Sequence, residues 1–163
     1  ALTDRMLMTR DADYRMNPPL REEADRLAIL AGIQDGTIDA IATDHAPHTP
    51  EEKADFERAP NGVVGLETSL AAGITYLVNE NVITIERLIE LMSTNPAKLL
   101  GIPAGTLAER ENADLILIDP DKSWTVTPEG FCSKARNSAF KNTTLTGRVM
   151  LTICRGKVVM SRL

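Results

Sequence analysis

The chain has 163 residues, of which 43% are hydrophobic and 25% are charged, an ordinary globular composition. This excludes a disordered or low-complexity chain, and there is no apolar run of about 18 residues that could cross a membrane. The net charge is −5, and the basic residues are scattered along the chain, so nucleic-acid binding is not expected.

The two cysteines, Cys132 and Cys154, lie in unrelated segments and do not form a disulfide framework. Because the chain also opens without a signal peptide, we expect a cytoplasmic protein. The chain starts at Ala1 without a methionine and contains only two histidines, His45 and His48.

In chain order, the first predicted elements are a loop, a helix and a strand. Residues 1–17 are polar and mixed and predict a loop. Apolar residues then recur at helical spacing over 21–34, and Gly36 can take the left-handed conformation that ends a helix. Residues 38–43 are a short β-type run. Together these segments form one α/β unit, which favours a parallel sheet. The apolar positions of the helix are Ala24, Leu27, Ala28 and Ala31.

A long connection, residues 49–65, leads from this strand to three further predicted helices. The first covers residues 66–78, and the second covers residues 85–93 after an N-terminal cap at Thr84. The third is short, with Asn95 as its cap, Pro96 in its first turn and Gly101 at its end.

Strands dominate the rest of the sequence. Residues 115–118 and 124–126 are strand-like, and 147–154 and 157–160 flank the predicted hairpin turn Arg155-Gly156. Because helices precede Gly105 and strands follow it, we place a boundary there, giving domains at residues 1–105 and 106–163.

Residues 44–48, with the sequence Asp-His-Ala-Pro-His, are the sharpest chemical feature. Carboxylate and imidazole groups are zinc ligands and proton carriers, and α/β enzymes place such groups at the carboxyl ends of parallel strands. The spacing alone equally fits an Asp-His pair that caps the next element. A catalytic zinc site needs about three protein ligands. With two histidines and two distant cysteines, a complete His-rich site cannot be built from this chain alone.

Two further segments have a structural and a functional interpretation. Asn17 precedes a proline and is therefore extended, so its amide could face a ligand or could belong to a plain turn. Residues 61–65 could offer backbone groups to a ligand, because glycine allows close approach, or could form a turn before a helix.

Taken together, three segments resemble bacterial dihydroorotases of the type that joins a barrel to a β-domain. These are residues 16–21, 41–48 and 59–68. Residues 95–101 and 113–115 are similar to the closing signature of the wider amidohydrolase superfamily. Residues 133–140, 145–147 and 156–157 continue the match to the end of the chain. One departure is Arg110, which stands where the superfamily usually has glycine in a turn.

The resemblance implies the C-terminal part of a TIM-like (β/α)8 metal-dependent hydrolase barrel, followed by a small β-rich, sandwich-type domain. The earlier strands, with their metal-binding histidines, have no counterpart here, so we interpret the chain as an incomplete C-terminal segment. Such an enzyme reversibly cyclises N-carbamoyl-L-aspartate to L-dihydroorotate in pyrimidine biosynthesis.

Residue by residue, the resemblance implies that Asp44 ligates Zn²⁺ and acts as general base and then general acid. His48 would bind the substrate carboxylate. Asn17 and the backbone at Gly62 and Val63 would bind the amide edge of the ring. His45 is expected to support the site through packing.

Two alternatives stay open. A hydantoinase- or allantoinase-like cyclic amidase shares the general pattern, although His48 suits a substrate that carries a carboxylate. An inactive dihydroorotase-like partner of aspartate transcarbamoylase is the second. The resemblance further implies a homodimer and a possible association with aspartate transcarbamoylase.

Overall fold

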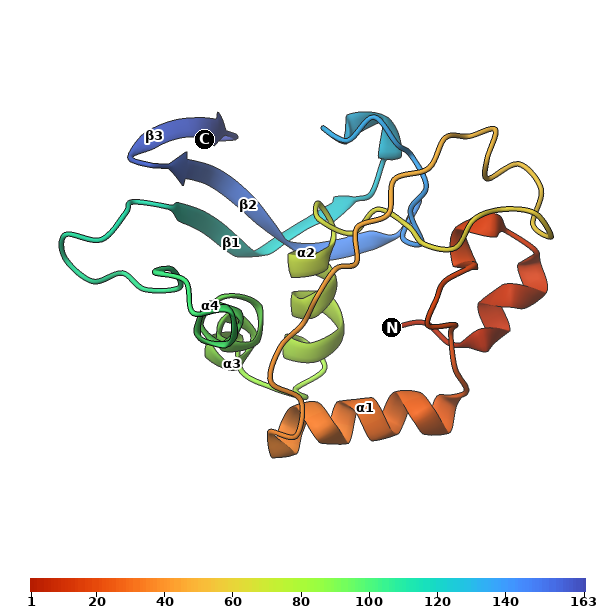
Figure 1. Ribbon diagram of the computed structural model, residues 1–163, viewed down its shortest axis with the longest axis horizontal. Coiled ribbons are helices and arrows are strands. Elements are labelled where there is room, and N and C mark those ends of the chain that lie inside the picture. Colours follow the sequence, from red (N-terminus) through yellow and green to blue (C-terminus); the bar gives the residue numbers. More distant parts are fainter. The chain divides into compact units, whose positions relative to one another are not determined.

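The computed structural model describes residues 1–163 (Figure 1). The chain divides into two compact units. The first unit comprises residues 1–35, 43–69 and 125–144, and the second comprises residues 36–42, 70–124 and 145–163. The domain boundary near Gly105 stays a prediction.

The N-terminal segment of the first unit is helical where a loop was predicted. It forms two 3₁₀ helices, η1 (Asp4–Thr9) and η2 (Ala12–Tyr14). Arg10 takes the left-handed conformation and ends η1, and the side chain of Asp11 accepts the N–H of Asp13 at the start of η2. Local caps of this kind stabilise single turns that a hydrophobic pattern does not reveal.

The predicted helix after Pro19 is confirmed as α1 (Glu23–Asp35), and Gly36 follows it with φ 85°. The apolar face of this helix, however, is not buried by the chain. Leu27 and Ile29 are 52% and 51% exposed, and Ile33 is the one buried residue of the helix. Helical spacing therefore predicted the helix correctly, but it did not predict that apolar side chains of the helix are exposed.

The predicted strand at residues 38–43 is absent. The segment is held by the helices of the second unit, because the Ile41 N–H donates to the Leu91 carbonyl at 2.9 Å and the Asn95 side chain donates to the Asp39 carbonyl at 3.0 Å. A strand requires a hydrogen-bonded neighbour, and no other segment pairs with this one. The chain accordingly contains no parallel sheet.

The helices of the second unit lie in the predicted regions of the chain, but they begin and end at other residues than predicted. A short helix α2 (Ser69–Gly73) continues as the π-helix η3 (Ile74–Val78). Farther along, α3 (Ile85–Ile89), the π-helix η4 (Glu90–Thr94) and α4 (Asn95–Leu100) follow one another without a break.

The caps at the two ends of this helical run are confirmed. The Thr84 side chain accepts the Arg87 N–H, and Gly101 ends the run with φ 63°. The predicted cap at Asn95 is wrong, because its backbone is helical and the preceding turn leads directly into α4. The buried apolar residues of these helices are Ala71, Ile74, Leu77, Leu88, Leu91 and Ala97.

Three strands form one sheet in the order β1 (Leu115–Thr125), β2 (Thr144–Cys154) and β3 (Lys157–Ser161). The predicted β2–β3 hairpin is confirmed as antiparallel, with Arg155 and Gly156 at positive φ in its turn. The two strands predicted at residues 115–126 are one strand, β1. A single 3₁₀ turn, η5 (Pro128–Gly130), lies between β1 and β2.

Gly147 lets β2 lie against the helix η3 in the second unit. A Cβ atom at Gly147 would collide with the Ile74 side chain. The Thr146 N–H donates to the Thr75 hydroxyl at 2.8 Å, and the Trp124 ring nitrogen donates to the Gly147 carbonyl at 3.0 Å. These polar contacts fix the position of helix and strand around the buried Ile74.

No helix of the structure has both the length and the hydropathy that a transmembrane span needs. Cys132 and Cys154 are free, exposed thiols.

Candidate active site

Asp44 stands out through its backbone conformation and its lack of partners. It has φ 43°, in the left-handed region that aspartate tolerates better than most residues. Its carboxylate is exposed and makes no hydrogen bond or ion pair with the chain. Such backbone conformations cluster at functional sites, and a carboxylate without intramolecular partners is free to bind a ligand.

The residues that follow Asp44 explain this conformation, because they are anchored to the segment 61–65. The ring Nδ1 of His45 accepts the Gly65 N–H at 3.1 Å, and the Ala46 N–H donates to the Val63 carbonyl at 2.9 Å. His45 thus has the supporting contacts that were expected of it.

Gly62 is required where these two segments approach each other. It has φ 106°, and a Cβ atom there would lie 2.6 Å from the Cβ of Ala46 and 3.9 Å from Nε2 of His48. No side chain fits that space. The close packing brings the predicted substrate-binding residues His48, Gly62 and Val63 together.

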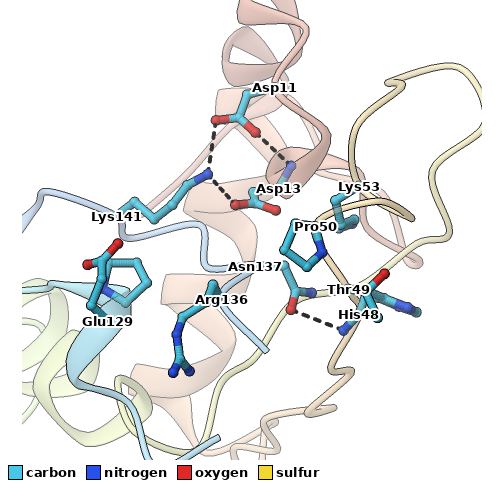
Figure 2. Close-up of a pocket in the computed structure, with 11 residues that line it drawn as sticks. Asp11, Asp13, His48, Thr49, Pro50, Lys53, Glu129, Arg136, Asn137 and Lys141 are labelled. Atoms are coloured by element: carbon cyan, nitrogen blue, oxygen red, sulfur yellow. Dashed lines mark hydrogen bonds and ion pairs between the residues drawn. The ribbon is translucent and has the colours of Figure 1, made fainter. Parts of the chain in front are cut away.

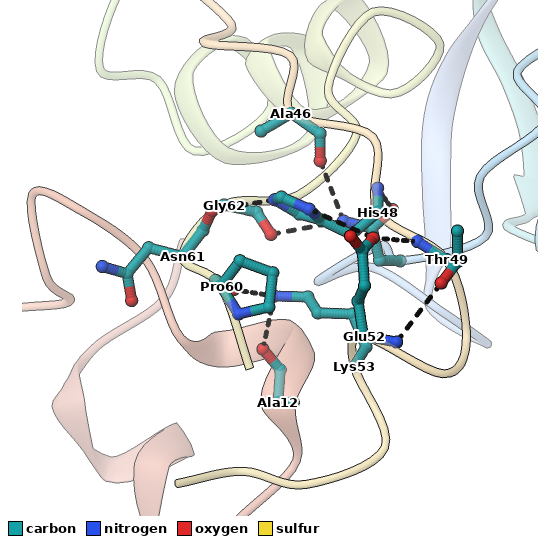
Figure 3. A network of polar contacts seen from close by, with 10 residues as sticks. Ala12, Ala46, His48, Thr49, Glu52, Lys53, Pro60, Asn61 and Gly62 are labelled. Carbon is teal, nitrogen blue, oxygen red and sulfur yellow. Dashed lines mark hydrogen bonds and ion pairs between the residues drawn. The ribbon is translucent and has the colours of Figure 1, made fainter. Parts of the chain in front are cut away.

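The His48 ring is held from two sides (Figure 3). Its Nε2 lies 3.0 Å from the carbonyl oxygen of Asn61, and its Nδ1 lies 3.7 Å from Oε2 of Glu52. The His48 side chain is 20% exposed, so it is placed by the protein and still reachable by a ligand.

The backbone around Gly62 is mostly engaged within the protein. The Gly62 N–H donates to the Arg15 carbonyl at 2.9 Å, and the Gly62 carbonyl accepts from the Asn137 side chain at 3.2 Å. The Val63 carbonyl accepts from Ala46, which leaves the Val63 N–H without a partner in the chain. Of the backbone groups predicted to bind substrate, this N–H is the available donor.

Asn17 is the predicted site residue that the structure does not bring into contact with the others. Its side chain is exposed and makes no hydrogen bond with the chain. The neighbouring residue Arg15 joins this segment to the site, because its Nε donates to the Asn61 side chain at 3.1 Å and its guanidinium also donates to the carbonyls of Phe56 and Glu57.

A pocket of about 250 Å³ in the first unit has His48 at its wall (Figure 2). Sequence reasoning missed most of its polar lining, since those residues are far apart in the chain. The lining residues are Asp11, Asp13, His48, Thr49, Pro50, Lys53, Pro128, Glu129, Arg136, Asn137 and Lys141.

Two lysines of this pocket have opposite electrostatic surroundings. Lys141 Nζ lies 2.5 Å from the buried Asp13 carboxylate and 3.6 Å from that of Asp11. Burial alone would lower the pKa of Lys141, but the hydrogen bond and charge of Asp13, aided by Asp11, outweigh it and raise the pKa. Lys53 instead donates to the Ala12 and Pro60 carbonyls, each at 2.9 Å, and burial lowers its pKa.

The chain by itself offers few metal ligands. No group of three or more His, Cys, Asp and Glu side chains is placed to hold a metal ion. The free carboxylate of Asp44 has the chemistry of a single zinc ligand.

The chain belongs to the amidohydrolase family, whose family model matches residues 5–159. Among its relatives, a dihydroorotase from Clostridioides difficile is 50% identical over 159 residues, which cover 97% of this chain and 37% of that protein. A dihydroorotase from Desulforapulum autotrophicum is 48% identical over 162 residues, or 99% of this chain and 38% of that protein. The predicted resemblance is therefore confirmed, and the chain spans a little over a third of the length of these relatives.

Solved structures show the same fold. An L-hydantoinase (dihydropyrimidinase) from Arthrobacter aurescens has a TM-score of 0.92 and 34% identity, covering 99% of this chain and 37% of its own. A dihydropyrimidinase from Brevibacillus agri has a TM-score of 0.84 and 27% identity, covering 92% of this chain and 34% of its own. The arrangement of helices and strands described above is thus a segment of the amidohydrolase fold.

Proposed function

We propose that this chain is the C-terminal part of a dihydroorotase, which cyclises N-carbamoyl-L-aspartate to L-dihydroorotate and hydrolyses the ring in the opposite direction. The observation that carries the proposal is the packing of residues 44–48 on residues 61–65. The free carboxylate of Asp44 and the ligand-accessible ring of His48 belong to one short loop, and this loop packs on the segment that carries the free Val63 N–H. Dihydroorotase relatives 48–50% identical over nearly the whole chain support the same activity.

In this proposal, residues 1–105 complete a TIM-like barrel and residues 106–163 belong to a β-rich domain. The segment 38–43, which has no strand partner within this chain, would then be the last barrel strand, and Asp44 would follow it directly. Neighbouring barrel strands would supply those partners, as they do in any closed parallel barrel.

Asp44 would be one ligand of a zinc ion, with the remaining ligands outside this chain. A zinc ion bound there would supply Lewis-acid chemistry, polarising the scissile carbonyl and lowering the pKa of water toward neutrality. The free Asp44 carboxylate would accept the proton of the attacking water and deliver it to the leaving ring nitrogen. One carboxylate that carries the proton between the two atoms avoids expulsion of an amide anion.

The other residues would bind and orient the ring. His48, when protonated, would donate a charge-assisted hydrogen bond to the substrate carboxylate. The Val63 N–H would donate to a ring carbonyl, with Gly62 providing the room for close approach. Asn17, exposed and unpartnered, would contact the amide edge.

A hydantoinase-like activity is the alternative, since the solved structures of the same fold include hydantoinases. The L-hydantoinase is 34% identical to this chain, less than the 48–50% of the dihydroorotases, and His48 has no carboxylate to bind on an unsubstituted hydantoin. An inactive role beside aspartate transcarbamoylase would not require the free Asp44 carboxylate. The homodimer and the association with aspartate transcarbamoylase stay predictions.

The test is to assay the purified protein that contains this chain, with dihydroorotate, hydantoin, dihydrouracil and allantoin as substrates, with and without added zinc. We expect turnover of dihydroorotate that depends on metal and exceeds turnover of the other three by orders of magnitude. Preferred turnover of hydantoin or dihydrouracil would replace the proposal with the alternative, and no turnover of any substrate by the metal-loaded protein would reject both.

A further inference from the structure

Asn137 lies where the two segments of the candidate active site meet. It belongs to residues 125–144, the last of the three segments of the first unit, and is only 4% exposed. Its side chain lies between the loops of residues 44–48 and 61–65, and Figure 2 shows its hydrogen bond to His48.

The carboxamide of Asn137 uses its acceptor and both of its donors at once. Its Oδ1 accepts the backbone N–H of His48 at 3.1 Å. Its Nδ2 donates to the Ala46 carbonyl at 2.9 Å and to the Gly62 carbonyl at 3.2 Å. The backbone carbonyl of Asn137 also accepts the Val64 N–H at 2.9 Å.

These contacts attach both loops to one rigid group. Two hydrogen bonds go to the loop of residues 44–48, and the other two go to the loop of residues 61–65. Only an amide has the donors and the acceptor in this arrangement, because aspartate lacks the donors and an apolar side chain lacks both. Buried polar groups that lose such partners carry a large desolvation cost.

We propose that Asn137 is a positioning residue, which fixes the His48 ring relative to the Val63 N–H and so aligns the two ends of a cyclic substrate. This inference rests on the proposed function and deepens it. Asn137 itself touches no substrate; it acts through the backbone of both loops. Its loss should therefore weaken substrate binding more than it weakens catalysis by Asp44.

The test compares Asn137→Asp and Asn137→Ala with the unaltered protein. In its ionised form an aspartate at this position faces two carbonyl oxygens without a hydrogen, so we expect KM for dihydroorotate to rise roughly tenfold to a hundredfold at alkaline pH, and kcat to fall much less. Burial raises the pKa of a carboxyl group. Because the protonated aspartate can donate to one carbonyl, the deficit relative to the unaltered protein should shrink as the pH is lowered. Asn137→Ala should show no such recovery.

Ser138→Ala is the matched control. Ser138 is 1% exposed, but its hydroxyl accepts only from the Phe140 N–H within its own loop. We expect this variant to lose thermal stability without a change in KM. Equal KM effects in the Ser138 and Asn137 variants, or an unchanged KM in Asn137→Asp, would overturn the proposal.

Hydrogen exchange of the peptides covering residues 44–48 and 61–65 provides a readout that does not depend on activity. Faster exchange in both peptides, in whichever Asn137 variant folds, is expected; unchanged exchange in both contradicts the inference. If the unaltered protein does not act on dihydroorotate, the proposed function fails, and the exchange data still decide whether Asn137 joins the loops.

Discussion

The Nε2 atom of His48 lies 3.0 Å from the carbonyl oxygen of Asn61. A carbonyl oxygen only accepts, so this ring nitrogen must carry its hydrogen. In the neutral ring the backbone therefore fixes the tautomer of His48, and Nδ1 is the ring atom that remains for a ligand. Nδ1 can donate to a carboxylate only when the ring is protonated. Glu52, at 3.7 Å from Nδ1, competes with a substrate carboxylate for the same atom.

Replacing His48 by alanine in the protein that contains this chain should chiefly impair substrate binding. Loss of a charge-assisted hydrogen bond costs about 1.5–3 kcal/mol, which is roughly tenfold to over a hundredfold in affinity. Steady-state kinetics with dihydroorotate measure this as a rise in KM. Unchanged constants at unchanged metal content would remove His48 from the binding site.

Asp44→Asn should abolish turnover while the fold persists. Asparagine tolerates the left-handed backbone of this position, and its side chain makes no intramolecular contact that could be lost. It cannot accept a proton at neutral pH, and general acid–base catalysis contributes about 10²–10⁴-fold. Turnover is measured together with zinc content, and near-normal rates at full zinc occupancy would contradict the role of Asp44.

Gly62→Ala and Gly36→Ala form a matched pair. Both glycines have positive φ, but an alanine at Gly36 meets nothing within 4 Å, whereas one at Gly62 meets the Ala46 Cβ at 2.6 Å. The strain common to both costs about 1–2 kcal/mol. Gly62→Ala should lose a further 1–3 kcal/mol or so from overpacking, and only this variant should raise KM. Denaturant unfolding and kinetics of both variants check this, and equal losses would show that the loops can separate freely.

The raised pKa of Lys141 predicts a loss of folding stability at alkaline pH. Its folded-state pKa is raised above the ordinary value of 10.5, so its contribution is fully present below that pH and is lost as the pH rises through the folded-state pKa. The difference in unfolding free energy between the unaltered protein and Lys141→Met should stay constant up to the ordinary pKa of 10.5 and shrink only as the pH rises above it. Lys53, whose pKa burial lowers, should show the opposite trend in the same comparison with Lys53→Met. Parallel trends for the two lysines would contradict the assigned surroundings.

The isolated chain of residues 1–163 should have no dihydroorotase activity, even with zinc. It provides one candidate ligand, Asp44, and no group of three metal-binding side chains, where a catalytic zinc needs about three. The assay uses the purified chain alone. Metal-dependent turnover under these conditions would show that the ligand count is wrong.

Local signals in the sequence predicted the elements whose stability is local. Thr84 and Gly101 mark helix ends through their own caps, and Arg155-Gly156 turns the hairpin through its own backbone angles. The segment 38–43 shows the limit of this reasoning. Its β-branched residues favour a strand, but strand formation depends on a neighbour, and the backbone of this segment bonds to helices instead.

In the candidate site, too, residues that share a local motif were predicted, and contacts between distant segments were not. Asp44 and His48 were predicted because they lie four residues apart in one motif. Asn137 was noted only within the family resemblance, because its contacts connect residues 75 to 91 positions away in the chain. The pairing of Lys141 with Asp13 was missed for the same reason. No local pattern predicts a hydrogen bond between segments that only the fold brings together.

The contacts of Arg15 also bear on the chemical ageing of the protein. Asn61-Gly62 is an Asn-Gly sequence, in which the glycine nitrogen can attack the asparagine side chain to form a succinimide, and asparagine is a thermolabile residue. Here that nitrogen donates its hydrogen to the Arg15 carbonyl, and the Asn61 side-chain oxygen accepts from the Arg15 guanidinium. Because one residue restrains both reacting groups, we expect Arg15 to slow deamidation at Asn61, whose carbonyl oxygen contacts the His48 ring. An isoaspartate at this position would lengthen the backbone beside His48.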